Sequence, residues 1–385
     1  MNESLKCEYA KLCGSCKLLD YNYHETLVYK LNMINKCLKK EDINYKVDEI
    51  VSSPLKTAYR NKMIIGFKNL KGKIIAGFYE EGSHRIVDMK SCLMHTDIQN
   101  KIFNDFLSLI KKMHIEIYDE DKRSGLLRYL LIKEAQITSE IMIVIVVSSD
   151  IFPGRNNLVK ELRKLNPNIK TIIQNTNSRK TSIVLGDKSR VLYGPGYIYD
   201  YIGDIKFRLS PNSFFQVNPK QALNIYNDVR TYANLNKNEV AIDAYSGVAT
   251  IASYLANDAK KVIAVENNKQ ATLAAIANLK ENNINNVIVI NDDATNFLIN
   301  EAKNKNTYDL VVLDPPRCGS TSEFIKSVAL VKAKKVIYVS CGPDSLARDL
   351  KLFIKLGYVV DKMKCYDMFC YADHVEAVCL LKNYK

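Results

Sequence analysis

The sequence predicts an α/β fold in two parts: an α+β domain over residues 1–210, and a domain over residues 211–385 built on a doubly wound, mostly parallel sheet. Three observations support this prediction. A chain of 385 residues is long enough to bury two separate cores. From about residue 236, apolar runs alternate with helical stretches, as in parallel sheets. Earlier in the chain, apolar and alternating runs follow one another with few helices, which is typical of antiparallel strands.

Composition and charge indicate a soluble globular protein with a polyanionic partner. Hydrophobic residues make up 47% and charged residues 25%, and the net charge is +13. That charge favours nucleic acid as the partner, although a lysine-rich solvated surface would also account for it. No apolar run is long enough to span a bilayer. Because the start, MNESLKCEYA, lacks the apolar stretch of a signal peptide, we expect a cytoplasmic protein. We also expect a monomer.

The N-terminal part is expected to contain three helices and a set of short strands. The first helix covers 20–42, with Leu27, Leu31, Ile34 and Leu38 on one face, and the others lie near 97–112 and 156–165. The expected strands are 63–67, 73–78, 126–132, 141–147, 170–173, 182–185 and 206–209.

Three cysteines lie within ten residues near the start of the chain. Cys7, Cys13 and Cys16 form a C-x5-C-x2-C pattern, and Cys92 stands alone downstream. Four thiolates are the ligand set of a [4Fe–4S] cluster and also of an all-cysteine zinc site. Zinc sites more often show two paired C-x2-C knuckles, so the pattern favours the cluster. Unrelated thiols remain an alternative, more so for Cys92 than for the other three.

Candidate RNA contacts are spread over the N-terminal part. The stretch 59–62, Tyr-Arg-Asn-Lys, combines an aromatic surface with two cations, which suits single-stranded RNA, but a solvated strand end is equally compatible. Six further cations could form a basic face: Arg123, Arg128, Lys133, Arg155, Arg179 and Lys180.

In the C-terminal part, polar residues follow successive predicted strands. The strands are 240–244, 261–266, 287–292, 310–314 and 335–341, with a clear helix at 268–282 and a final hairpin of 357–368 and 374–382. In parallel sheets, ligands bind at the carboxyl ends of the strands. The first strand leads into Asp243-Ala-Tyr-Ser-Gly247, which has one glycine where dinucleotide sites carry three. Glu266 could bind ribose hydroxyls and the acidic pair after Asn291 an adenine amino group, although such residues also cap helices. The combination favours S-adenosylmethionine over NAD.

Two further motifs flank this pocket. Asp314-Pro-Pro-Arg317 follows the fourth strand, and its two prolines fix the backbone beside the carboxylate, as methyl transfer to a flat base would need. Upstream, Gln216 follows Phe214 and Phe215 and could hydrogen-bond a cofactor or base. Packing at the entry to the domain is the alternative, mainly for the two phenylalanines.

Cys341 lies between a buried strand and a helix, on the turn Ser-Cys-Gly-Pro. This position exposes a thiol and places it near a helix N-terminus, which favours the thiolate. Taken alone, a buried structural cysteine is the commoner role. Asp373, His374 and Glu376, close to the last strand, are the candidate acids and bases.

In combination these motifs resemble the RNA uracil-C5 methyltransferases. The resemblance rests on the order and spacing of Phe-Phe-Gln at 214–216, Asp-Pro-Pro-Arg at 314–317, Ser-Cys-x-Pro at 340–343, Leu-Ala-Arg-Asp at 346–349 and His-Val-Glu at 374–376. The N-terminal cysteines are similar to those of the iron–sulfur branch that acts on 23S ribosomal RNA. The resemblance implies a Rossmann-like methyltransferase domain, and an N-terminal α+β RNA-binding domain that carries the iron–sulfur loop.

The resemblance also implies roles for individual residues. Cys341 would be the nucleophile and Glu376 the base, the S-adenosylmethionine positions would be Gln216, Tyr245, Glu266 and Asp314, and the [4Fe–4S] ligands would be Cys7, Cys13, Cys16 and Cys92. The implied substrate is a uridine in 23S ribosomal RNA. A transfer-RNA uracil-C5 methyltransferase is the nearest alternative, and a non-catalytic RNA-folding factor is another.

The sequence departs from the family pattern at three positions. Gly342 replaces a usual Asn, Cys370 a usual Pro, and Ala249 the second glycine of a usual Gly-x-Gly. We also expect no N-terminal oligonucleotide-binding barrel, because Cys7 lies so near the start of the sequence.

Overall fold

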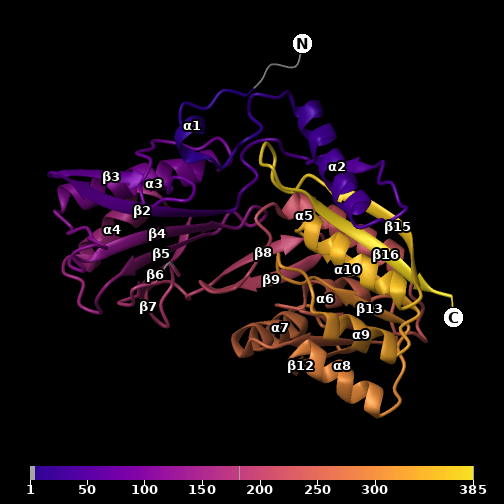
Figure 1. Cartoon of the computed structure of the whole chain (residues 1–385). Helices are drawn as coiled ribbons and strands as arrows, with labels where there is room; N and C mark the ends of the chain where they lie inside the picture. Colours follow the sequence, from indigo (N-terminus) through magenta and orange to yellow (C-terminus); the bar gives the residue numbers. More distant parts are fainter. Residues whose placement is uncertain (1–4, 182, 385) are drawn as a thin grey trace.

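The computed structural model describes residues 5–181 and 183–384. These residues form an eight-stranded sheet, a six-stranded sheet and a two-stranded hairpin. Figure 1 shows the six-stranded sheet on one side of the molecule, the eight-stranded sheet with its helices on the other, and the hairpin between them. No helix in this described part is long and apolar enough to cross a membrane.

The eight-stranded sheet has the strand order β1-β15-β16-β14-β13-β10-β11-β12. From β14 to β12 neighbouring strands are parallel, whereas β16 is antiparallel to both β14 and β15. The strand order reverses between β10 and β13, the kind of position where such sheets bind ligands. The predicted doubly wound sheet is confirmed. Its strands are β1 (Ile50–Val51), β10 (Val240–Ala244), β11 (Lys261–Glu266), β12 (Val287–Asn291), β13 (Leu310–Leu313), β14 (Lys335–Ser340), β15 (Tyr358–Tyr366) and β16 (Glu376–Asn383).

Helices cover both faces of this sheet because successive residues of its central strands are apolar on both sides. Ala241 belongs to one core layer, with α5, α6 and α7, and Ile242 to the other, with α2, α8, α9 and α10. The helices are α2 (Tyr23–Lys40), α5 (Pro219–Ala233), α6 (Thr250–Ala256), α7 (Lys269–Glu281), α8 (Ala294–Lys303), α9 (Ser322–Leu330) and α10 (Pro343–Lys355).

The eight-stranded sheet includes segments from the start of the chain. β1 pairs in parallel with β15, at the edge of the sheet. α2 packs with α10 in the same core layer, and its N-terminus is closed by a capping box between Asn22 and Glu25. A division of the chain at residue 210 therefore remains a prediction, and two elements that precede this residue pack with elements beyond it.

The six-stranded sheet has the order β3-β2-β4-β5-β6-β7, with α3 and α4 packed in its core. Its strand pairs are antiparallel as expected, except that β5 and β6 are parallel because α4 connects them as a crossover helix. The elements are β2 (Lys62–Leu70), β3 (Lys73–Gly77), α3 (Asp97–Lys112), β4 (Leu127–Glu134), β5 (Ile141–Val147), α4 (Arg155–Leu165), β6 (Ile169–Thr176) and β7 (Lys188–Tyr193). The short helix α1 (Ala10–Cys13) precedes them.

The prediction of a strand at 182–185 is wrong for the residues of it that the structure describes, 183–185. Residue 182 lies outside the described residues, as do residues 1–4, and 183–185 are in no strand. Instead, the side-chain amide of Asn177 donates to the carbonyls of Ile183 and Val184, at 2.7 and 3.1 Å, and so occupies groups that a sheet would use.

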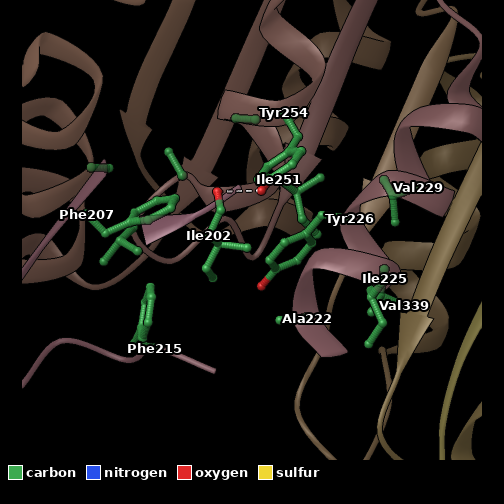
Figure 2. Packing of buried hydrophobic residues seen from close by; sticks show 14 of the residues in the cluster. Ile202, Phe207, Phe215, Ala222, Ile225, Tyr226, Val229, Ile251, Tyr254 and Val339 are labelled. Atoms are coloured by element: carbon green, nitrogen blue, oxygen red, sulfur yellow. Dashed lines mark hydrogen bonds between the residues drawn. The ribbon is translucent and has the colours of Figure 1, made fainter. Parts of the chain in front are cut away.

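The hairpin of β8 (Ile198–Ile202) and β9 (Ile205–Leu209) joins the two sheets. Its inward residues pack with α5 and α6 in the first core layer. Figure 2 shows this packing, in which the Tyr254 hydroxyl donates to the carbonyl of Ile202 at 2.6 Å, beside the ring of Tyr226. The hairpin thus fixes the stretch that leads into Gln216.

Candidate active site

Three of the predicted site residues meet at the carboxyl edge of the eight-stranded sheet. β13 ends at Leu313 and β14 at Ser340, so Asp314 and Cys341 directly follow neighbouring strands. Ser340 pairs with Ala377 of the antiparallel strand β16, and this register puts Glu376 across from Cys341. Both carboxylates act electrostatically on the thiol, which agrees with this proximity.

Acidic groups gather around Cys341. Burial, and then the charges of Glu376 and Asp314, raise the pKa of the Cys341 thiol to about 11, against the influence of Arg317. Burial, and then Glu376 and Asp243, hold the pKa of Asp314 well above its usual range. A positive charge placed among these groups would favour their ionised forms and lower their pKa values. The site is therefore suited to a cationic ligand.

Tyr226 of α5 belongs to this site, although no sequence pattern pointed to it. Its ring lies 5.3 Å from that of Tyr254, and both rings are buried in the core layer of Figure 2. Gln216 hydrogen-bonds to the Tyr226 hydroxyl; burial, and then Asp314, raise the pKa of that hydroxyl. An aromatic residue on an amphipathic helix usually indicates core packing, so only the fold reveals this contact.

The aromatic residues before Gln216 differ in their surroundings. Phe215 is buried, with its ring 5.7 Å from that of Phe207, whereas Phe214 is 67% exposed. The main-chain carbonyl of Gln216 accepts a hydrogen bond from the side chain of Asn61 at 3.0 Å. The six-stranded sheet thereby supports the loop that carries Gln216.

Gly342 allows the turn after Cys341 to approach the Asp-Pro-Pro-Arg loop closely. Its φ of −133° is ordinary extended backbone, so no conformational freedom special to glycine is used. A Cβ atom here would instead lie 2.7 Å from the carbonyl oxygen of Arg317 and 2.7 Å from the hydroxyl of Ser345. A glycine is therefore favoured at position 342 because a Cβ atom would be too close to these two oxygen atoms.

Residues of α10 hold the loop after Asp314 against the Cys341 turn. Ser345 Oγ donates to the Arg317 carbonyl at 2.9 Å, and Arg348 donates to the Cys318 carbonyl at 2.9 Å. Asp349 accepts hydrogen bonds from the Ser320 amide at 2.7 Å and from the Tyr338 hydroxyl at 2.8 Å. One helix thus fixes both strand-end turns of the site relative to each other.

The ends of β10 and β11 form the candidate adenosine pocket. The carboxylate of Glu266 accepts the amides of Gly247 and Asn268, at 2.9 and 2.7 Å. Asp243 Oδ1 and Ser246 Oγ are buried without a hydrogen-bond partner in the described part of the chain. A Cβ atom on Gly247 would meet nothing within 4 Å. The open space at Gly247 leaves room for a ligand beside the Glu266 carboxylate.

Other predicted residues near this pocket have structural partners. The Tyr245 hydroxyl lies 3.2 Å from Ser320 Oγ, and its ring packs 5.3 Å from that of Phe324, so it connects two strand-end loops. Asp293 accepts the amides of Thr295 and Asn296 and thereby caps α8. In the structure, Asp293 therefore has the helix-capping role that was the alternative to binding an adenine amino group.

The four N-terminal cysteines lie in one region. Cys7, Cys16 and Cys92 pack in a small apolar cluster around Leu19 and Tyr59. Burial, and then the thiol of Cys92, raise the pKa of Cys16 to about 12, and Cys7 and Cys13 add to this effect. Among the described residues, no group of three or more His, Cys, Asp or Glu is placed so that it could hold a metal ion. The geometry of the described residues therefore supports neither the predicted iron–sulfur site nor the zinc alternative.

Several predicted RNA contacts are buried. Tyr59 is 0% and Asn61 5% exposed, so the hypothesis that the stretch 59–62 offers a stacking surface is wrong. Arg128 is buried in an ion pair with Glu120 at 2.7 Å, and Lys133 donates to carbonyls of the 210–213 loop. The exposed or half-buried members of the proposed basic face are Arg123, Arg155, Arg179 and Lys180.

Comparisons with known proteins agree on a family. A family model described as tRNA (Uracil-5-)-methyltransferase matches residues 23–384. An uncharacterized RNA methyltransferase from Clostridium tetani is 38% identical over 98% of the chain and 82% of its own length. One from Halalkalibacterium halodurans is 35% identical over 98% of the chain and 82% of its own length.

Among solved structures, the chain is similar to the Pyrococcus abyssi tRNA (uracil-54, C5)-methyltransferase in complex with S-adenosyl-L-homocysteine. The TM-score is 0.80 at 27% sequence identity, and the match covers 96% of this chain and 86% of that one. The likeness therefore includes both sheets of the fold.

Proposed function

Since the chain belongs to the tRNA (uracil-5-)-methyltransferase family, a family of S-adenosylmethionine-dependent RNA methyltransferases, we propose that it methylates C5 of a uridine through a covalent adduct on Cys341. The observation that carries this proposal is the convergence of Asp314, Cys341 and Glu376 at one sheet edge. A protein that only binds RNA would not need a thiol between two buried carboxyl groups.

The proposed reaction uses the thiol to activate a poor carbon nucleophile. S-adenosylmethionine, when bound, supplies a methyl group on a positively charged sulfur. The Cys341 thiolate adds to C6 of uracil, and the electron pair of the C5–C6 double bond moves into an enolate. C5 then takes the methyl group, the bond between that methyl group and the donor's sulfur breaks, and neutral S-adenosylhomocysteine is left. Glu376 removes the proton from C5, the C5–C6 double bond forms again, and the C6–sulfur bond breaks.

The surrounding residues suit this sequence of steps. Burial and the two nearby carboxyl groups raise the pKa of the Cys341 thiol, and the positively charged sulfur of a bound methyl donor would favour the thiolate. Asp314 and Gln216 both act on the Tyr226 hydroxyl, and we propose that these two residues lie between the nucleophile and the methyl donor. The target base must leave its stack to reach Cys341.

The binding roles are part of the same proposal. Glu266, with Asp243 and Ser246 beside it, would hold the adenosine half of the methyl donor, and Tyr245, Gln216 and Asp314 its methionine half. Isothermal titration with S-adenosylhomocysteine tests this assignment. Glu266→Gln should weaken binding at least 10-fold, and unchanged affinity would refute the role of Glu266.

We further propose that Cys7, Cys13, Cys16 and Cys92 hold a [4Fe–4S] cluster. Its support is the four-thiol donor set in one region of the fold, and no step of the reaction passes through it. Anaerobically purified protein should contain about four irons and should be brown, as such a cluster requires. Stoichiometric zinc would refute the cluster.

Ribosomal RNA is the substrate that we propose first, because the cysteine pattern resembles the branch that acts on 23S RNA. Transfer RNA is the second candidate, favoured by the description of the family model and by the similar Pyrococcus abyssi enzyme. The proposal also includes a cytoplasmic location and a monomeric protein. Size-exclusion chromatography with light scattering tests whether the protein is a monomer.

One experiment tests the reaction and its substrate together. The protein is incubated with S-adenosylmethionine and with separated ribosomal and transfer RNA, and 5-methyluridine is mapped. Product on ribosomal RNA is expected; product only on transfer RNA would reverse the order of substrates, and no product would refute the enzyme. With RNA containing 5-fluorouridine, Cys341→Ala should abolish the covalent adduct. A persisting adduct would point to Cys318 or Cys370.

A further inference from the structure

A fully buried ion pair joins the start of the chain to the loop before Glu376. Lys30 of α2 and Asp367 are each 0% exposed, and the Lys30 ammonium lies 2.5 Å from Asp367 Oδ1. Removing two charges from water is costly, and apolar side chains of similar size often stabilise a fold as well. A contribution to stability is therefore a weak explanation of this pair, and a role in fixing local geometry is the alternative.

The pair lies among contacts that hold the loop between β15 and β16, residues 367–375. Lys30 also donates to the carbonyl of Phe369 at 2.7 Å. Asp367 accepts a second hydrogen bond, from the Tyr23 hydroxyl at 2.8 Å, and that hydroxyl in turn accepts the Ser53 amide at 2.8 Å. The hydrogen bonds of Lys30 and Asp367 thus hold this loop, either directly or through the Tyr23 hydroxyl.

Three further hydrogen bonds attach the same loop to other parts of the chain. The Leu18 amide donates to the Tyr371 carbonyl at 2.9 Å, Cys370 Sγ to the Leu55 carbonyl at 3.3 Å, and Asn218 to the Met368 carbonyl at 3.2 Å. The loop has no regular structure of its own, and it ends at Glu376. Its position therefore depends on these external contacts.

α2 is a rigid support for this purpose. Ile34 and Leu38, one and two turns beyond Lys30, are buried against α10, the helix that begins directly after the Cys341 turn. Lys351 of α10 also forms an ion pair with Glu41, just beyond the end of α2, at 3.2 Å. Figure 1 shows α2 at the β15 end of the sheet. The same helix thus contacts the element behind the nucleophile and the loop that leads to the base.

We propose that Lys30, through its ion pair with Asp367, is a positioning residue that sets Glu376 against C5 of the bound uridine. This inference rests on the proposed function, because it assigns Glu376 as the base. A base that is misplaced by about 1 Å loses roughly 10- to 100-fold in rate. The proton on C5 leaves only after methyl transfer, so a misplaced base should let the methylated adduct accumulate on Cys341.

The test compares Lys30→Met, Lys30→Met/Asp367→Asn and Phe106→Ala with the wild type on RNA that contains ordinary uridine. Denaturing gels measure the fraction of protein joined to RNA, and methyl transfer gives kcat and KM. The double variant removes the unpaired buried charge that Lys30→Met leaves behind, and thermal unfolding reports how far it restores stability. Phe106→Ala is the control for lost stability: Phe106 is buried beside Phe67 in the core of the six-stranded sheet, a cluster that contains no residue of α2 or α10.

We expect both Lys30 variants to lose roughly 10- to 100-fold in kcat with an unchanged KM for RNA, and to accumulate adduct that the wild type and Phe106→Ala do not. Glu376→Gln, which removes the base itself, sets the maximum. If the double variant regains stability and kcat together and accumulates no adduct, the pair only stabilises the fold and the proposal is wrong. A wild type that forms neither 5-methyluridine nor an adduct would instead refute the proposed function.

Discussion

Replacing Gly342 by Asn, the residue usual in the family, should damage this protein. The backbone at Gly342 is extended, so the substitution adds no conformational strain and its effect is purely steric. The new Cβ would lie 2.7 Å from the Arg317 carbonyl, which must move by about 0.7 Å to reach ordinary van der Waals contact at 3.4 Å. Pro315 and Pro316 stiffen the loop that would have to move.

The expected cost follows from this overlap. Overpacking against a backbone atom costs about 1–3 kcal/mol, which lowers the unfolding midpoint by a few degrees. Because the displaced loop carries Asp314, we also expect kcat to fall roughly 10- to 100-fold. Gly342→Ala should show most of both effects, since it already introduces the Cβ atom.

Differential scanning fluorimetry and methyl-transfer kinetics measure these two quantities. Gly66→Ala is the matched control, because a Cβ there would meet only the side chains of Ile86 and Tyr79, at 3.2 Å. That variant should stay within about 1 kcal/mol of the wild type. If Gly342→Asn matches the wild type in midpoint and kcat, the close approach to Arg317 does not constrain the turn and the reasoning fails.

Three further predictions concern single groups of the site. The thiol of Cys341, whose pKa is raised to about 11, should react with iodoacetamide at pH 8 roughly 10-fold more slowly than a free cysteine. Glu376→Gln should speed this reaction. Mass spectrometry of the alkylated peptide measures the rate, and a rate equal to that of a free cysteine would contradict the prediction. Burial raises the pKa of the Asp243 carboxyl to about 7, so the stability that this group contributes is full below about pH 4 and is lost as the pH rises through 7. Urea unfolding at several pH values should show that the change in the free energy of unfolding over this range differs by about 4 kcal/mol between wild type and Asp243→Asn. Parallel curves for the two proteins would exclude this contribution of Asp243. Tyr226→Phe, which removes the hydroxyl bonded to Gln216, should lower kcat about 10-fold without lowering the unfolding midpoint, and full activity would remove Tyr226 from the site.

The doubly wound sheet was predictable because its central strands are apolar on both faces. Runs such as 310–313 and 335–340 contain few polar residues, and a sheet covered by helices on both sides requires this pattern. The convergence of Asp314, Cys341 and Glu376 followed from the same reasoning, since each lies where a predicted strand ends or begins. Sequence patterns are informative where one local rule decides the structure.

Other features depend on partners distant in the chain. On α2, the apolar pattern placed Leu27 and Leu31 on the buried face, but the most buried residues are Thr26, Lys30 and Ile34. A lysine on a helix is normally solvated, and only Asp367, far along the chain, explains its burial. The strand β8 was missed for a similar reason: its central Asp200 is buried, where its carboxylate accepts the amides of Gln136 and Ile137.

The path of the chain through the two sheets has a consequence for dividing the protein. The backbone completes α2 and β1 of the eight-stranded sheet, leaves to build the whole six-stranded sheet, and returns through the hairpin β8–β9. In topological terms, the six-stranded sheet is an insertion within the other domain. A fragment that starts at residue 211 would leave the edge of β15 unpaired and the apolar side of α10 uncovered, both of which promote aggregation. Any shortened version would have to keep both ends of the chain, because α2 and β1 pack with elements beyond residue 211.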